Sequence, residues 1–121
     1  MVFVMEKIVE QGLLYDFYGP LLTEHQQEIY EACIYEDLSL AEAAERFEIS
    51  RQGVHDILKR CDKILKAYEE KLGLIKRFNE QNSGLEDIRK LMEKNRDKNG
   101  SIRLSAEECD RVLEILSEIG E

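Results

Sequence analysis

Tryptophan is absent from this 121-residue chain, proline occurs once, and cysteine occurs three times. The cysteines, Cys33, Cys61 and Cys109, are widely spaced, odd in number and contain no CxxC pair, so neither a zinc site nor a disulfide framework is indicated. Each falls on an apolar helical stripe, which predicts three buried free thiols in a reducing cytoplasm. We therefore expect a cytoplasmic protein with no metal and no cofactor.

Long hydrophobic runs and strand patterns are also missing. No stretch approaches the length of a membrane span, and the apolar start of the chain is too short for a signal peptide, so no membrane insertion is expected. No segment alternates apolar and polar residues with the β-branched enrichment of a strand. Helix-forming residues dominate instead, and the composition predicts an all-α protein.

Basic charge is scarce and localised. The chain has 26 acidic and 17 basic residues, for a net charge of −9. Residues 50–66 are an exception, because they hold five bases and two acids. The acidic remainder would repel nucleic acid, so any contact with it is expected along this segment.

Residues 39–60, SLAEAAERFEISRQGVHDILKR, have the pattern of a helix-turn-helix. Ser39 and Glu42 form a capping box before the first helix, and Ser50 caps the second. The helices must cross closely, and Ala44 is expected as the small residue at the crossing. Glu48 occupies a turn position where a left-handed backbone usually calls for glycine, at a cost of about 1 kcal/mol.

The second helix of this motif is the one that would read a nucleic-acid groove. Its outward polar positions are the candidate nucleic-acid-binding residues, and none is proposed as catalytic: Arg51, Gln52, His55, Lys59, Arg60 and Lys63. A solvated polar helix face is the alternative for the same residues, and it suits Asp56 and Asp62 better, because carboxylates repel phosphates.

The recognition helix is predicted to run from Ser50 to about Asn79, which is about 45 Å at 1.5 Å per residue. Such a length exceeds the width of a small bundle, so its apolar seam needs cover from the C-terminal helices or from a second subunit. We expect a homodimer, because helix-turn-helix proteins use twofold symmetry to match two half-sites.

The domain division follows from this long fourth helix. Residues 1–79 are expected to form the helix-turn-helix domain and residues 80–121 a C-terminal helical tail. Residues 82–84, Asn-Ser-Gly, are expected to break the chain, with Ser83 and Glu86 capping the next helix. The last helix is expected to start at Ser105 and to face inward with Cys109, Val112, Leu113, Leu116 and Ile119.

The chain resembles the YlxM family of small bacterial proteins, and more distantly region 4 of sigma factors. The resemblance covers about residues 8–75 and rests on LLYDFYGPLLT and on the segment LTEHQQEIYEACIYEDLSLAEAAERFEISRQGVHDILKRCDKILKAYEEKLGL. It implies a non-catalytic accessory or regulatory protein of the signal recognition particle. The implied partners are the RNA of that particle, its GTPase subunit, or both.

Two other functions compete with this one. A DNA-binding transcriptional regulator would use Arg51 on guanine and Gln52 on adenine near the start of the recognition helix. An enzyme is not expected, because the chain has no P-loop, no HExxH motif and no defensible pair of carboxylates. His55 and Asp56 are neighbours on a helix, so their side chains diverge by about 100° and are not expected to form a dyad.

Overall fold

The computed structural model describes residues 2–120, and the side chains of residues 7–120. Its elements are α1 (Val2–Tyr18), the 3-10 helix η1 (Gly19–Leu21), α2 (Glu24–Ile34), α3 (Leu40–Phe47), α4 (Arg51–Leu72), α5 (Leu74–Lys94) and α6 (Ala106–Gly120). Over these residues the only β-type pairing is an isolated bridge between Arg96 and Ile102, so the all-α prediction is confirmed. None of the helices described is both long and apolar enough to cross a membrane.

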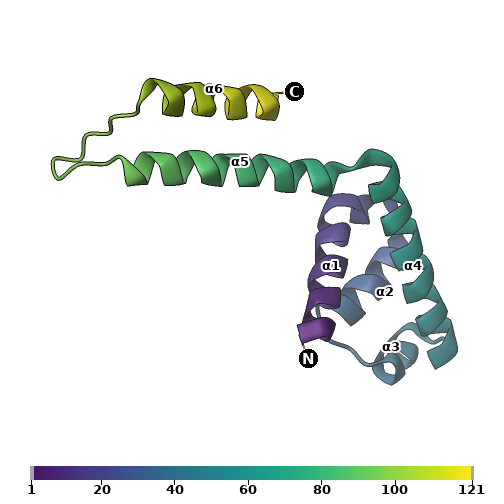
Figure 1. Cartoon of the computed structure of the whole chain (residues 1–121). Helices are drawn as coiled ribbons and strands as arrows, with labels where there is room; N and C mark the ends of the chain where they lie inside the picture. The colour runs from purple at the N-terminus through teal and green to yellow at the C-terminus, as the bar shows by residue number, and fades with distance from the viewer. Residues whose placement is uncertain (1, 121) are drawn as a thin grey trace. The chain divides into compact units, whose positions relative to one another are not determined.

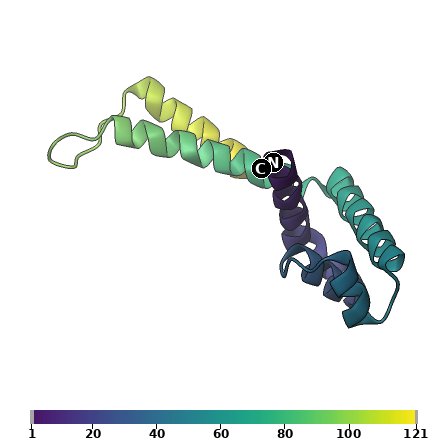
Figure 2. The same cartoon turned by 90° about the horizontal axis from the view of Figure 1, so that it is seen from below.

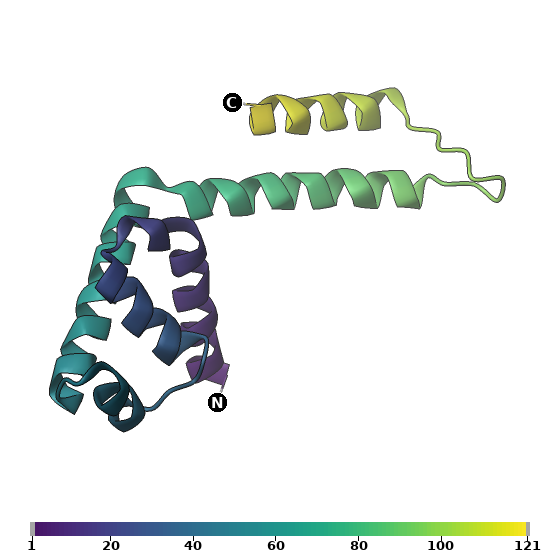
Figure 3. The ribbon, with the colours of Figure 1, turned by 180° about the vertical axis from the view of Figure 1, so that it is seen from behind.

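The chain divides into two compact units, and the division lies inside α5. Unit 1 ends at Ile75, and unit 2 begins at Lys76. The division expected from the sequence, between residues 79 and 80, therefore lies four residues further along the same helix. Figure 1 shows unit 1 as α1, α2 and α3 packed with α4, and Figures 2 and 3 show unit 2 as a hairpin in which α5 and α6 run antiparallel.

Unit 1 is built around α4, which contacts α1, α2 and α3. One core cluster joins α1, α2 and α4 and is rich in aromatic rings: Leu14, Tyr15, Tyr18, Leu22, Tyr30, Cys61, Leu65 and Ile75. A second cluster lies under the helix-turn-helix and consists of Ile29, Ala43 and Val54. The seam of α4 is thus buried within unit 1 at Val54, Cys61 and Leu65, whereas Leu72 at its end is 53% exposed. The homodimer stays a prediction.

The predicted caps of the helix-turn-helix are present. Ser39 Oγ accepts from the backbone N–H of Glu42, whose carboxylate accepts from the N–H of Ser39, both at 3.1 Å. The backbone hydrogen bond to Ser39 lowers the pKa of Glu42. Ser50 Oγ accepts from the N–H of Gly53 at 2.9 Å and starts α4. A further capping box, of Thr23 and Gln26, starts α2.

The small residue at the crossing of α3 and α4 is Ala43 rather than Ala44. Ala43 is fully buried against Ile29 and Val54, whereas Ala44 lies half-buried at the edge of that cluster. The carbonyl of Ala44 has a different role, because it accepts from the N–H of Ile49 at 3.1 Å and closes the turn. The expected crossing residue was therefore off by one position.

Glu48 has φ 56° and ψ 44°, the left-handed conformation that its turn position predicted. A left-handed backbone costs a residue with a Cβ about 1 kcal/mol. Glu48→Gly is therefore expected to stabilise unit 1 by up to about 1 kcal/mol, which is about 4–8 °C in Tm for a domain of this size. Thermal melting followed by circular dichroism checks this expectation.

Gly73 provides the converse control for that prediction, because it ends α4 with φ 62°. Gly73→Ala is expected to lower Tm by a similar amount, and Glu48→Ala to leave it nearly unchanged. A Glu48→Gly variant that melts below the wild type would show that the turn is held by the side chain and not strained by it.

Two glycines exchange their expected roles. Gly73 was expected inside a continuous helix, but its N–H bonds to the carbonyl of Glu69 at 2.8 Å and its left-handed backbone ends α4. Gly84 was expected to break the chain, but α5 passes through it, so the cap predicted for Ser83 and Glu86 is wrong. A Cβ on Gly84 would lie 2.9 Å from Ile115 Cγ2, so glycine is needed there for the close approach of α6.

The last helix starts as predicted, with a capping box of Ser105 and Glu108, but it packs by a different face. Ile115 is its buried residue, flanked by half-buried Val112 and Ile119. Leu113 and Leu116, expected to face inward, are 63% and 48% exposed. Cys109 is also exposed, and Cys33 is only partly buried, so the prediction of three buried thiols holds for Cys61 alone.

Candidate nucleic-acid interface

The outer face of α4 carries the candidate residues. Ser50 fixes the start of the helix, and the buried residues Val54, Cys61 and Leu65 fix which side faces the core. The six predicted residues then all lie exposed on the remaining surface: Arg51, Gln52, His55, Lys59, Arg60 and Lys63.

In the first turns of α4, polar side chains contact one another. The side-chain amide of Gln52 donates to Asp56 Oδ1 at 2.9 Å, and His55 Nδ1 lies 3.6 Å from the same oxygen. His55 and Asp56 thus approach more closely than their divergence on the helix predicted. The distance is longer than a hydrogen bond, and both side chains are more than half exposed, so the contact is a surface one.

The middle of α4 forms a basic groove together with α1. The groove has a volume of about 480 Å³, and its lining is Lys7, Asp56, Lys59, Arg60, Asp62, Lys63 and Lys66. Three of the six predicted residues meet here, whereas Arg51, Gln52 and His55 do not line it. The name basic groove is used below for this set of seven residues.

Lys7 and Lys66 extend the site beyond the candidate residues. Lys66 belongs to the basic segment that the sequence singled out, and its spacing of seven from Lys59 places it on the same face of α4. Lys7 comes from an otherwise acidic region, and only the packing of α1 beside α4 brings it to the groove. No signal in the sequence near Lys7 distinguishes it from any other surface lysine.

Asp62 is a structural residue within the groove. Its carboxylate accepts a hydrogen bond from the Tyr30 hydroxyl at 2.7 Å and from the side-chain amide of Gln11 at 3.0 and 3.1 Å. Burial, and then this bond to Asp62, raises the pKa of Tyr30 well above its usual value. Asp62 therefore ties α4 to α1 and α2 and holds the two walls of the groove together, which explains an acid among so many bases.

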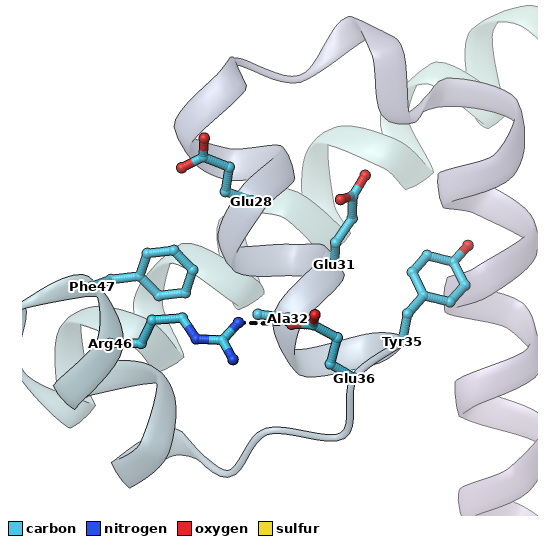
Figure 4. Close-up of a pocket in the computed structure, with 7 residues that line it drawn as sticks. All are labelled: Glu28, Glu31, Ala32, Tyr35, Glu36, Arg46 and Phe47. Atoms are coloured by element: carbon cyan, nitrogen blue, oxygen red, sulfur yellow. Dashed lines mark hydrogen bonds and ion pairs between the residues drawn. The ribbon is translucent and has the colours of Figure 1, made fainter.

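A second hollow, of about 370 Å³, lies between α2 and α3 and has the opposite charge (Figure 4). Its lining is Glu28, Glu31, Ala32, Tyr35, Glu36, Arg46 and Phe47. The Arg46 guanidinium bridges to Glu36 at 2.8 Å, which leaves the surrounding surface acidic. Burial, and then a hydrogen bond to Asp16, raises the pKa of Tyr35 to about 12. Unit 1 thus presents a basic groove and a separate acidic hollow.

The described residues that line the two hollows do not form the ligand set of a metal site. Among the residues described, no three His, Cys, Asp or Glu side chains gather where they could hold a metal ion. The groove instead offers ammonium and guanidinium groups, which bind phosphate oxygens.

Comparison with known proteins agrees with this architecture. The family model UPF0122, described as helix-turn-helix proteins that are YlxM / p13 like, matches residues 5–105. The chain belongs to this family. The UPF0122 protein of Thermoanaerobacter sp. is 47% identical over 107 residues, which are 87% of this chain and 92% of that relative.

Two further UPF0122 proteins match over about two thirds or more of their length. The UPF0122 protein of Bacillus cereus is 34% identical over 109 residues, which are 90% of this chain and 99% of that relative. The protein of Caldanaerobacter subterraneus is 53% identical over 77 residues, covering 64% of this chain and 66% of the relative. The family match extends past Ile75 into unit 2, so both units belong to the shared architecture.

Proposed function

We propose that this UPF0122 protein is a non-catalytic, cytoplasmic accessory protein of the signal recognition particle that holds the RNA of that particle in the basic groove. The observation that carries the nucleic-acid contact is the groove itself. A chain with a net charge of −9 gathers five cationic side chains on one face of unit 1. Such a concentration of bases is the footprint of phosphate binding.

The position of the cations favours phosphate contacts over base reading. They lie along the middle of α4 and on α1, whereas helix-turn-helix proteins read bases with the first residues of the recognition helix. Gln52, the residue suited to adenine, is engaged with Asp56. Phosphate contacts position a ligand without reading its sequence, which suits a structured RNA recognised by shape.

The assignment to the signal recognition particle is supported by the resemblance of residues 8–75 to the YlxM family. The acidic hollow of unit 1 adds a second element, because its carboxylates complement a basic protein surface. The GTPase subunit, whose RNA-binding domain is basic, is the protein partner that we propose for it. A transcriptional regulator remains the alternative, favoured by the exposed Arg51 at the start of α4.

A fluorescence anisotropy titration tests the proposal. The full chain is added to labelled signal recognition particle RNA at two salt concentrations, with unlabelled duplex DNA as competitor. We expect binding that weakens steeply with salt and that duplex DNA fails to compete. Duplex DNA that competes at equal concentration would favour the transcriptional regulator, and no binding at low salt would refute the nucleic-acid role.

A further inference from the structure

Unit 2 is a hairpin with a single row of interior contacts. Its interior positions are Gln81, Gly84, Ile88 and Leu91 on α5, Asn95 directly after that helix, and Glu108, Val112, Ile115 and Ile119 on α6. These positions alternate in steps of three and four, which is the spacing of a coiled-coil seam. Hydrogen bonds fix the register at both ends, from Asn95 Nδ2 to Glu108 at 2.9 Å and from Gln81 Nε2 to the carbonyl of Ile119 at 3.4 Å.

Large apolar side chains remain exposed beside this row. Leu85 is 50% exposed and Met92 is 37% exposed, and each directly follows an interior position of α5. On α6, three exposed residues each directly follow an interior position: Cys109, Leu113 and Leu116. They are three or four residues apart, so they are neighbours on the helix surface. We call this set, Leu85, Met92, Cys109, Leu113 and Leu116, the apolar face of unit 2.

The members of the apolar face lie on one side of the hairpin. Two antiparallel helices are related by a twofold axis perpendicular to the plane that contains both. Rotation about this axis carries a residue on one side of the plane to the same side on the other helix. Residues that follow an interior position therefore flank the same side on both helices. Residues that precede one flank the opposite side. All of them are exposed, and all except Ser83 are charged: Glu80, Asp87, Lys90, Lys94, Glu107, Arg111, Glu114 and Glu118.

The other side carries the apolar face, together with Asn82, Arg89 and Arg96, which also follow interior positions, and Arg89 is paired with Glu86 at 2.7 Å. Exposed apolar side chains on one side of a two-helix hairpin leave its core incomplete. A unit of fewer than about 50 residues with two helices cannot bury enough apolar surface alone, and oligomerisation is a common remedy. Two copies placed apolar face to apolar face bury the same residues on both sides, as a twofold interface requires. The product is a four-helix bundle.

We propose that a second copy of this chain covers the apolar face, so that the protein dimerises through α5 and α6 of unit 2. This interface differs from the one that the length of α4 suggested, because Val54, Cys61 and Leu65 of that seam are buried in unit 1. The proposal does not depend on what the basic groove binds. It gives each assembly two basic grooves, one from each copy.

Light scattering coupled to size-exclusion chromatography tests the dimer with the full chain. The wild type is expected at twice the chain mass of 14.1 kDa. Leu85→Lys/Leu116→Lys is expected to raise the dimer dissociation constant at least about 100-fold and to elute as a monomer. Ser83→Lys/Ser117→Lys adds the same charge at exposed polar positions of the same helices and is expected to remain dimeric.

Cys109 provides a second readout that needs no substitution. Its exposed thiol lies in the apolar face, so the rate of alkylation at Cys109, followed by mass spectrometry, is expected to fall at least about tenfold as dilute chain is concentrated through the dimer transition. A monomeric wild type at all concentrations would overturn the proposal. A helical Leu85→Lys/Leu116→Lys variant that stays dimeric would overturn it as well, since the interface would then lie elsewhere.

Discussion

Replacing Lys59 and Lys63 by alanine is expected to weaken the binding of structured RNA about 25- to 60-fold at about 0.1 M salt. Both ammonium groups line the basic groove and come from adjacent turns of α4. Each phosphate contact releases a counterion from the nucleic acid when it forms. Losing one contact therefore makes the fall of log K with log salt concentration shallower by about 0.7 to 0.9. Two lost contacts therefore account for the expected factor, and the difference between variant and wild type should vanish near 1 M salt.

The matched control for this variant is Lys90→Ala/Lys98→Ala, which removes the same charge from exposed positions of unit 2. It is expected to bind RNA within about twofold of the wild type, because neither lysine lines the groove. If the control lost as much affinity as Lys59→Ala/Lys63→Ala, net charge rather than the groove would determine binding.

A second comparison separates phosphate binding from base reading. Arg51→Ala/Gln52→Ala removes the side chains placed to read bases at the start of α4, neither of which lines the groove. We expect it to weaken RNA binding less than Lys59→Ala/Lys63→Ala does. A larger loss, confined to particular sequences, would instead support a regulator that reads duplex DNA.

Short-range signals account for what the sequence could predict. The helix-turn-helix is specified by capping hydrogen bonds between residues three apart and by a turn between two amphipathic segments. The turn contains Glu48 in the left-handed conformation. Such interactions are complete within a few residues, so they can be recognised without knowledge of the rest of the fold. The exposure of Arg51 and Lys63 on α4 follows from the same periodicity.

Glycine roles and helix register required tertiary information. Gly73 and Gly84 both interrupt helical patterns, yet one ends a helix and the other admits Ile115 against its backbone. Helix α6 carries two interleaved apolar stripes, and periodicity alone cannot decide which one faces α5. The decision comes from long-range contacts such as that between Asn95 and Glu108.

The groove itself was only half predictable for the same reason. Lys7 is far from α4 in sequence, and it reaches the site because α1 is tied to α4 through Gln11 and Asp62. From the sequence alone, Asp62 is expected to repel phosphate and weaken the site. The structure shows that its carboxylate instead accepts a hydrogen bond from the Tyr30 hydroxyl. The residues that contact a ligand can be proposed from the face of one helix, whereas the residues that shape the site cannot.

Alkaline pH is expected to unfold unit 1 through its buried tyrosines. Tyr15, Tyr18 and Tyr30 are buried, and their hydroxyls donate to Glu31, Glu69 and Asp62 respectively. Burial is the main cause that raises the pKa of each one, and the bond to a carboxylate adds to it, because a phenolate there would face a second negative charge.

The sign of the effect follows from the unfolded reference. An unfolded tyrosine titrates near pH 10, whereas the folded chain keeps these three hydroxyls protonated to higher pH. Their contribution is therefore complete below about pH 10 and is lost as pH rises toward the folded pKa values. At pH 11 a tyrosine that stays protonated in the folded chain no longer contributes about 1.4 kcal/mol of stability. Tyr15 and Tyr30 together account for about 3 kcal/mol, to which Tyr18 adds in the same direction, and this is a large part of the stability of a small domain.

Thermal melts at pH 8 and pH 11, followed by circular dichroism and by phenolate absorbance, measure this loss. All five tyrosines of the chain precede Lys76, so the absorbance reports on unit 1 alone. Tm is expected to fall by more than about 15 °C, with the phenolate signal appearing together with unfolding. Tyr15→Phe/Tyr30→Phe should be less stable at pH 8 yet lose less Tm between the two pH values. Phenolate formation near pH 10 with the helices intact would show instead that these hydroxyls are open to water.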